Sequence, residues 1–284
     1  MTRIQKRSDG LAYLHLWRSG TAYESLNKFA HYKEWTNIRF SVLPLPSVPH
    51  ILVHDIRKGI PYSDESFDVI YCNHVFEHLS PSEGLAFLGE LKRTLKHDGI
   101  IRLVVPDLEL AAQEYLNSLR EYSREKTEEN HTRYQWSVLN LIDQMVRDKP
   151  GGLMLDTLKN GDIDKEQILR TMGDVLNNYI GKNELNENFD HIEKPSKIVD
   201  LLYKIRRVLT FGKKRYDPHT TREINKWLYD RVSLPLIMEE SGFRKVEQFT
   251  YDTSSIRDWH KYDFDKSNYG NYPLEPSIYF EAIR

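Results

Sequence analysis

One stretch, residues 53–108, constrains the fold most strongly, because it has the pattern strand, loop, strand, loop, helix, strand. Two of its strand candidates, residues 67–72 (FDVIYC) and 100–105 (IIRLVV), are nearly continuous apolar runs. Such runs are typical of strands that are covered on both faces of a parallel sheet. Two strands joined through a helix over this distance form a right-handed parallel crossover. The stretch therefore predicts an α/β doubly wound sheet.

The helix between these two strands carries start and stop signals. Ser80 is a good N-cap, Pro81 occupies the first helical position, and Glu83 completes a capping box. Gly99 is placed to end the helix. Four leucines recur at spacings of three and four and are expected to share one buried face: Leu85, Leu88, Leu91 and Leu95.

The remaining segments are expected to complete and cover this sheet. Strand candidates at residues 11–17, 36–43 and 50–53 precede the helix, so residues 1–108 form the first part of the core. Residues 109–219 are polar and mostly helical in pattern, and they predict a helical insertion or lid. Residues 220–284 complete the sheet with a helix at 233–241 and an antiparallel edge pair at 243–250 and 276–283. We expect one domain overall.

Charge and cysteine content narrow the classes of function. The chain has 40 basic and 42 acidic residues, a net charge of −2, which gives no broad electrostatic reason to expect a nucleic acid partner. Cys72 is the single cysteine, so an internal disulfide and a cysteine-based zinc site are both excluded. No run approaches the roughly 18 apolar residues of a membrane span. We therefore expect a cytoplasmic protein without a membrane span.

Three segments carry a family resemblance. Residues 54–109 (HDIRKGIPYSDESFDVIYCNHVFEHLSPSEGLAFLGELKRTLKHDGIIRLVVPDLE) resemble class I S-adenosylmethionine-dependent methyltransferases of the type 11 group. The resemblance is strongest to a bacterial subgroup associated with surface-glycan or small-molecule modification. Residues 136–152 resemble its lid segment, and residues 225–246 resemble its late helix and strand. The resemblance implies a mostly parallel seven-stranded sheet with a helical lid. It also implies methyl transfer to an oxygen or nitrogen of a small molecule or glycan.

The resemblance also assigns site residues at the carboxyl ends of the strands. In this family a glycine-rich turn after the first strand and an acid at the end of the second hold the cofactor. Asp55 and Ile56 match positions that meet its adenosine end, and Asn73 and His74 match positions in the donor and acceptor cleft. His74 would act as the base. The cofactor-binding positions are then Gly20, Arg39, Asp55, Ile56 and Asn73.

The sequence departs from the family at three ligand-facing places. In one alignment Trp17-Arg18-Ser19-Gly20 replaces the glycine-rich turn; in another the first strand ends at Leu26-Asn27 and the turn is deleted. Arg39 stands in place of the ribose-binding acid, and Asn225 stands where the subgroup commonly carries histidine. Two alternatives therefore stay open. One is a catalytically inactive relative that binds or scaffolds a protein partner or a second copy. The other is a site repurposed for a different ligand, such as a phosphorylated one.

The same region contains a pattern of metal proteases. His74, Glu77 and His78 spell HxxEH, which binds zinc when both histidines lie on one helical face. Here the pattern precedes the Ser80 cap and falls in a loop, so no zinc is expected. The resemblance gives Glu77 and His78 the role of supporting this loop. The plainer interpretations are a hydrogen-bonded loop histidine for His74 and an N-cap carboxylate for Asp55.

Overall fold

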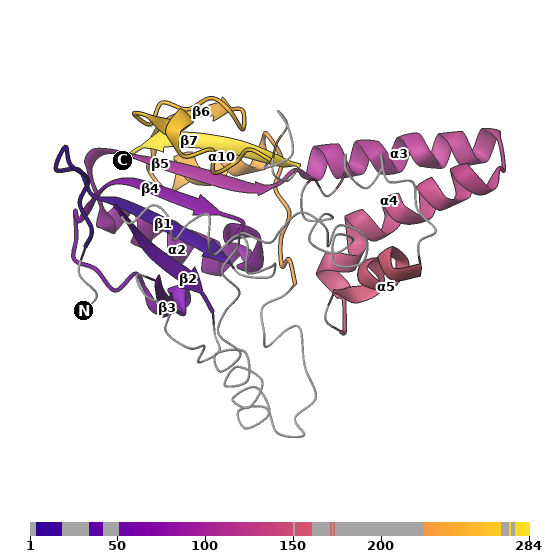
Figure 1. Cartoon of the computed structure of the whole chain (residues 1–284), viewed down its shortest axis with the longest axis horizontal. Helices are drawn as coiled ribbons and strands as arrows, with labels where there is room; N and C mark the ends of the chain where they lie inside the picture. Colours follow the sequence, from indigo (N-terminus) through magenta and orange to yellow (C-terminus); the bar gives the residue numbers. More distant parts are fainter. Residues whose placement is uncertain are drawn as a thin grey trace, which may run out of the picture.

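The protein is built on one seven-stranded sheet (Figure 1). The computed structural model describes residues 4–18, 34–41, 51–149, 151–160, 171, 173, 224–267, 273 and 276–284. Within these ranges the strand order is β3-β2-β1-β4-β5-β7-β6. Five strands are mutually parallel: β1 (Tyr13–Arg18), β2 (Trp35–Phe40), β3 (Ile51–His54), β4 (Phe67–Asn73) and β5 (Leu95–Pro106). The antiparallel pair at the edge is β6 (Arg244–Phe249) and β7 (Ser277–Ile283). The predicted doubly wound, mostly parallel sheet is confirmed.

The two faces of the sheet have different cores. Along β1, Leu14 and Leu16 point into one hydrophobic cluster, whereas Tyr13 and Trp17 point into another. The first cluster is completed by α2 (Pro81–Thr94) and α10 (Ser233–Glu240). The second cluster is rich in aromatic rings. Because β4 and β5 contribute residues to both clusters, their sequences are apolar at nearly every position.

The start of α2 is confirmed and its end is not. The Ser80 hydroxyl accepts from the Glu83 backbone N–H, and the Glu83 carboxylate accepts from the Ser80 N–H at 2.9 Å. The helix ends at Thr94, and Gly99 lies inside β5, so the prediction that Gly99 ends the helix is wrong. The reason is that Leu95 pairs with Phe67 of β4, while the Thr94 carbonyl accepts from the Ser66 N–H at 2.8 Å.

The buried face of α2 also differs from the leucine pattern. Leu88 and Leu91 are fully buried as expected, but Leu85 is 47% exposed. Phe87 takes its place against the sheet. Leu95 is buried as a strand residue and not as part of the helix.

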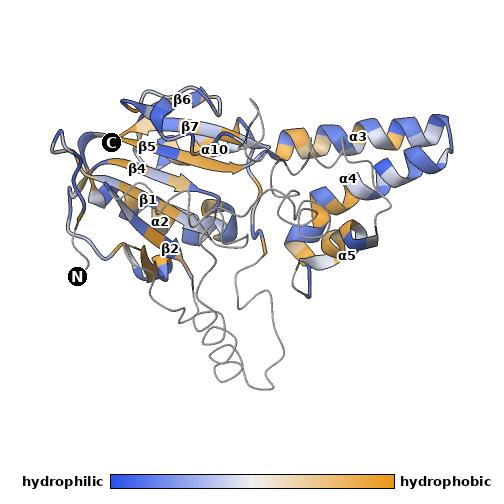
Figure 2. Ribbon diagram, viewed as in Figure 1, coloured by the Kyte–Doolittle hydropathy of each residue, from blue (hydrophilic) through white to orange (hydrophobic). Residues whose placement is uncertain are grey.

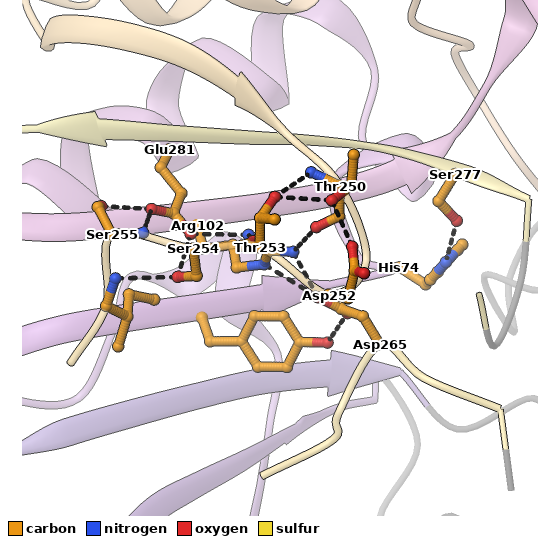
Figure 3. Close-up of polar contacts among 12 residues, drawn as sticks. His74, Arg102, Thr250, Asp252, Thr253, Ser254, Ser255, Asp265, Ser277 and Glu281 are labelled. Carbon is orange, nitrogen blue, oxygen red and sulfur yellow. Dashed lines mark hydrogen bonds and ion pairs between the residues drawn. The ribbon is translucent and has the colours of Figure 1, made fainter. Parts of the chain in front are cut away.

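An irregular segment, residues 250–267, contributes to the aromatic core. It contains the short 3-10 helix η3 (Trp259–Lys261) and is tied to the sheet by Arg102, a fully buried arginine of β5 (Figure 3). The Arg102 guanidinium pairs with Asp265 at 2.8 Å and Glu281 at 2.7 Å. It also donates to the carbonyls of Thr250 and Thr253. Ionic hydrogen bonds therefore hold this segment against β5 and β7.

Three helices follow β5, in the segment for which a helical insertion or lid was predicted. They are α3 (Leu108–Arg124), α4 (Glu128–Val146) and α5 (Gly152–Asn160). Asp107 caps α3, with its side chain accepting from the Glu109 N–H at 2.9 Å. In Figure 1 the α3–α4 hairpin extends away from the sheet, and Figure 2 shows that its far end is largely hydrophilic. No helix in the described ranges combines the length and apolar character needed to cross a membrane.

Candidate functional site

The carboxyl ends of the parallel strands meet at one edge, which is where ligands bind in open α/β sheets. The register aligns Trp17 of β1 with Arg39 of β2 on one side and Asn73 of β4 on the other. The backbone N–H of His74 continues this edge by donating to the Val104 carbonyl of β5 at 3.0 Å. The predicted positions Arg39 and Asn73 therefore lie on the two strands that flank Trp17 of β1.

His74 turns the chain sharply just beyond β4. Its φ is +48°, in the left-handed region that non-glycine residues seldom adopt. Both ring nitrogens lie near partners from distant places: Nδ1 is 3.3 Å from Glu77 Oε1, and Nε2 is 3.0 Å from Ser277 Oγ. Figure 3 shows the His74 ring pointing toward Ser277 at the start of β7. The His74 side chain is 18% exposed, so it can still be reached from outside.

Glu77 is a buried carboxylate between two histidines. It lies in the 3-10 helix η2 (Phe76–His78), and His78 Nε2 is 3.5 Å from its Oε1 atom. Burial would raise the pKa of the Glu77 carboxyl, but the charge of His78 and the hydrogen bond from His74 outweigh it and lower that pKa. His78 Nδ1 donates to the Ile224 carbonyl at 2.8 Å, and the Glu77 carbonyl accepts from the Lys226 N–H. These contacts confirm that Glu77 and His78 support the loop.

Two further polar atoms at this edge are buried without a hydrogen-bond partner among the described residues. One is Oδ1 of Asn73 at the end of β4, and the other is the hydroxyl of Tyr229. Burial, together with the nearby Glu77 charge, raises the pKa of the Tyr229 phenol. A buried acceptor that lacks a protein partner is the kind of atom that a ligand satisfies.

The position of β1 bears on both alignments of the cofactor turn. The alignment that placed the first strand at residues 13–16 is right about the strand, since β1 runs from Tyr13 to Arg18, but wrong in giving Trp17 and Arg18 to the turn. The alignment that ended the strand at Leu26-Asn27 is also wrong, since β1 pairs with both β2 and β4. Trp17 keeps the alternation of the strand and points into the aromatic core. Gly20 lies outside the described residues.

The other predicted cofactor positions are engaged within the protein. The Arg39 guanidinium lies 5.7 Å from the centroid of the Trp17 ring, a cation–π distance. Asp55 caps the 3-10 helix η1 (Ile56–Lys58) and forms two hydrogen bonds with Arg57, at 2.8 and 2.6 Å. Ile56 is buried in the hydrophobic core. The N-cap interpretation of Asp55 is confirmed, and its contact with a cofactor stays a prediction.

The HxxEH pattern does not form a helical metal face. His74 precedes the single 3-10 turn that contains Glu77 and His78. Among the residues that the structure describes, no group of three histidine, cysteine, aspartate or glutamate side chains is arranged to hold a metal ion.

Part of the sheet that carries this site matches a known protein family. Residues 16–103, from β1 to β5, match the family model described as a methyltransferase domain. This region is similar to a methyltransferase domain, and the seven-stranded, mostly parallel sheet has the class I methyltransferase fold. A search of curated proteins finds no match.

Among solved structures, the methyltransferase fold is similar to a SAM-dependent methyltransferase from Archaeoglobus fulgidus. The two are 11% identical, with a TM-score of 0.37, and the match covers 96% of this chain and 86% of that one. A putative methyltransferase from Bacillus halodurans is 12% identical, with a TM-score of 0.30, over 95% of this chain and 88% of that one. A SAM-dependent methyltransferase from Aquifex aeolicus is 19% identical, with a TM-score of 0.26, over 37% of this chain and 60% of that one.

Sequence reasoning missed Ser277 as a site residue. The final strand was predicted from its apolar pattern, but its partner was not, because a contact across 203 residues leaves no local signal. The Tyr229 hydroxyl was missed for a similar reason. Its position depends on the Leu108 N–H, which donates to the Tyr229 carbonyl at 3.0 Å beside the end of β5.

Proposed function

We propose that this protein transfers a methyl group from S-adenosylmethionine to an oxygen or nitrogen atom of a small molecule or glycan. One observation carries the proposal. The methyltransferase domain presents, at the carboxyl end of β4, a histidine held by a buried carboxylate, and beside it the buried Asn73 acceptor atom. Both groups lie where open α/β sheets bind their ligands.

The β4 side of the edge fits the cofactor. S-adenosylmethionine carries an ammonium and an adenine amino group, both of which are N–H donors. Either would satisfy the orphaned Asn73 Oδ1. At the end of β2, Arg39 and Phe40 supply no acid for the ribose. We therefore assign a cofactor contact to Asn73. At the end of β2 the cofactor would meet Arg39 instead of the acid that is usual in the family.

The residues at this edge suit methyl transfer. When bound, S-adenosylmethionine supplies an electrophilic methyl group on a positively charged sulfur. Methyl transfer depends mainly on holding donor and acceptor in line, so the protein contributes position above all. His74 is placed to take the proton that the acceptor gives up. Since α3 starts directly after β5, the predicted lid, residues 109–219, begins at this edge.

A second candidate rests on the engaged side chains at β1–β3. Arg39 lies over Trp17, and Asp55 is paired with Arg57, so two positions that meet the cofactor in the family are used internally. This favours a catalytically inactive relative that binds a protein partner. It also leaves room for a site that takes a phosphorylated ligand through Arg39.

Ligand-dependent stability separates these candidates. S-adenosylhomocysteine at 100 times its dissociation constant is expected to stabilise the protein by about 2.7 kcal/mol, measured as a thermal shift and checked by calorimetry. ATP serves as the phosphorylated control and should give no shift. If the protein is folded and millimolar S-adenosylmethionine and S-adenosylhomocysteine leave its melting temperature unchanged, methyl transfer is excluded. A shift with ATP alone would favour the repurposed site.

A further inference from the structure

Three side chains at the edge form a continuous hydrogen-bonded line. Ser277 Oγ is 3.0 Å from His74 Nε2, and His74 Nδ1 is 3.3 Å from Glu77 Oε1. They come from the first residue of β7, the residue after β4, and η2. In many active sites a hydroxyl is hydrogen-bonded to an imidazole that acts as the base, and a carboxylate on the other side of the ring orients that imidazole. The three side chains here have the same order.

We propose that Glu77 is the positioning residue for His74, and that His74 Nε2 receives the proton of a hydroxyl acceptor. The role of His74 as proton acceptor rests on the proposed function. The orientation of His74 by Glu77 does not, because it involves only residues of this chain.

The carboxylate fixes which nitrogen of His74 can act as a base. An ionised carboxylate can only accept hydrogen bonds, so the atom that faces Glu77, Nδ1, carries the hydrogen. Nε2 then presents its lone pair, and the Ser277 hydroxyl donates to it. His78 differs, because its Nδ1 hydrogen is given to the Ile224 carbonyl. Of the two histidines around Glu77, only His74 directs a basic nitrogen to the strand edge.

The surroundings strengthen this pairing. Glu77 is 2% exposed, and a charge pair is stronger at such a site than in water. An imidazolium at His74 would therefore be stabilised by a carboxylate that is already ionised. The titratable groups facing this pair from neighbouring elements are His78, Cys72 and Tyr229 around Glu77, and Asp265 near His74.

The need to remove a proton from the acceptor favours a hydroxyl as the group that is methylated. As the acceptor oxygen bonds to the methyl carbon, the carbon–sulfur bond breaks and its electron pair stays on the sulfur. The acceptor proton passes to His74 Nε2, so one positive charge disappears from the sulfur and one appears beside Glu77. A hydroxyl needs this proton removal to become a good nucleophile, whereas a neutral amine attacks through its lone pair first. The present partner of Nε2 is itself a hydroxyl, that of Ser277.

Imidazole nitrogen NMR tests the positioning without any cofactor. In the native protein we expect the His74 signals of the tautomer with hydrogen on Nδ1. In Glu77→Gln the midpoint of the His74 titration should move to lower pH, and the tautomer preference should weaken. The conservative Glu77→Asp should recover part of the effect. Glu281→Gln is the matched control, because it alters another buried carboxylate that has no contact with His74, and it should leave the His74 titration unchanged.

Ser277→Ala supplies a second variant in case Glu77→Gln fails to fold. It should uncover Nε2, so that His74 reacts several-fold faster with diethyl pyrocarbonate, with Ser255→Ala as the serine control. In activity assays, Glu77→Gln should lower kcat for hydroxyl acceptors by about 100-fold with little change in KM. An unchanged His74 titration in Glu77→Gln, or an unchanged modification rate in Ser277→Ala, would overturn the positioning. Methylation of amines alone would overturn the hydroxyl assignment. Absent cofactor binding would refute only the proposed function.

Discussion

At the scale of single residues, His15 shows how burial sets a charge state. Its ring lies in the aromatic core, stacked on Tyr71 with centroids 4.8 Å apart and on Phe264 at 5.5 Å. Nδ1 is 3.2 Å from the Asn37 side-chain oxygen, and the Asn37 amide donates to the Trp35 carbonyl. Burial lowers the pKa of His15 to about 3, only partly offset by the Asn37 hydrogen bond. The ring is therefore neutral throughout the physiological range.

This state predicts a loss of stability in acid. The unfolded chain binds a proton at His15 below its ordinary pKa of 6.5, whereas the folded chain does so only near 3. The unfolded state therefore binds more protons between these values, and stability falls as the pH drops through the window, by up to about 1.4 kcal/mol per pH unit. The free energy of unfolding, measured by denaturant titration at several pH values, should fall less steeply with decreasing pH in His15→Gln than in the native protein. The exposed His260→Gln should keep the native slope, and equal slopes for all three proteins would contradict the account.

At the scale of elements, α2 depends on its first turn. Ser80→Ala removes the acceptor for the Glu83 N–H and should cost about 1 kcal/mol in the free energy of unfolding, measured by chemical denaturation. Ser82→Ala, two residues later on the exposed side of the same turn, should cost much less. If both variants lose the same stability, the capping box is not what anchors the helix.

The two ends of α2 show what sequence can predict and what it cannot. The cap is local, because Ser80, Pro81 and Glu83 suffice to define it, and it was predicted correctly. The end depends on β5, which starts at Leu95 because Phe67 pairs with it from a strand nearly thirty residues away. Leu85 was misassigned for the same kind of reason, since the sheet beneath the helix selects Phe87. Periodicity identifies the element, and tertiary pairing sets its limits.

At the scale of the whole molecule, Arg102 joins the sheet to residues 250–267. Breaking a buried ion pair on one side leaves the other charge without compensation. Arg102→Met should therefore lower the free energy of unfolding by about 3–5 kcal/mol, because Asp265 and Glu281 would both stay buried without a positive charge to pair with. Limited proteolysis should also cut within residues 250–267 sooner. Arg244→Met, on the neighbouring strand β6 and half exposed, is the control and should change stability little.

The whole fold was more predictable than the site. Apolar runs, one capped helix and the parallel crossover were enough for a doubly wound sheet. His74 and Asn73 could be named as candidates because the ends of strands are visible in the sequence. Ser277 and Arg102 were not, since their partners come from segments more than a hundred residues apart.

The position of β7 has a consequence for how the protein is made. In the sheet β7 lies between β5 and β6, although β6 comes earlier in the chain. A ribosome therefore releases β6 before the strand that must separate it from β5. Ser277 and Glu281 also arrive on this strand, four residues apart and on the same face. Until β7 pairs with β5 and β6, a nascent chain lacks both the Ser277 hydroxyl that contacts His74 and the Glu281 carboxylate that pairs with Arg102.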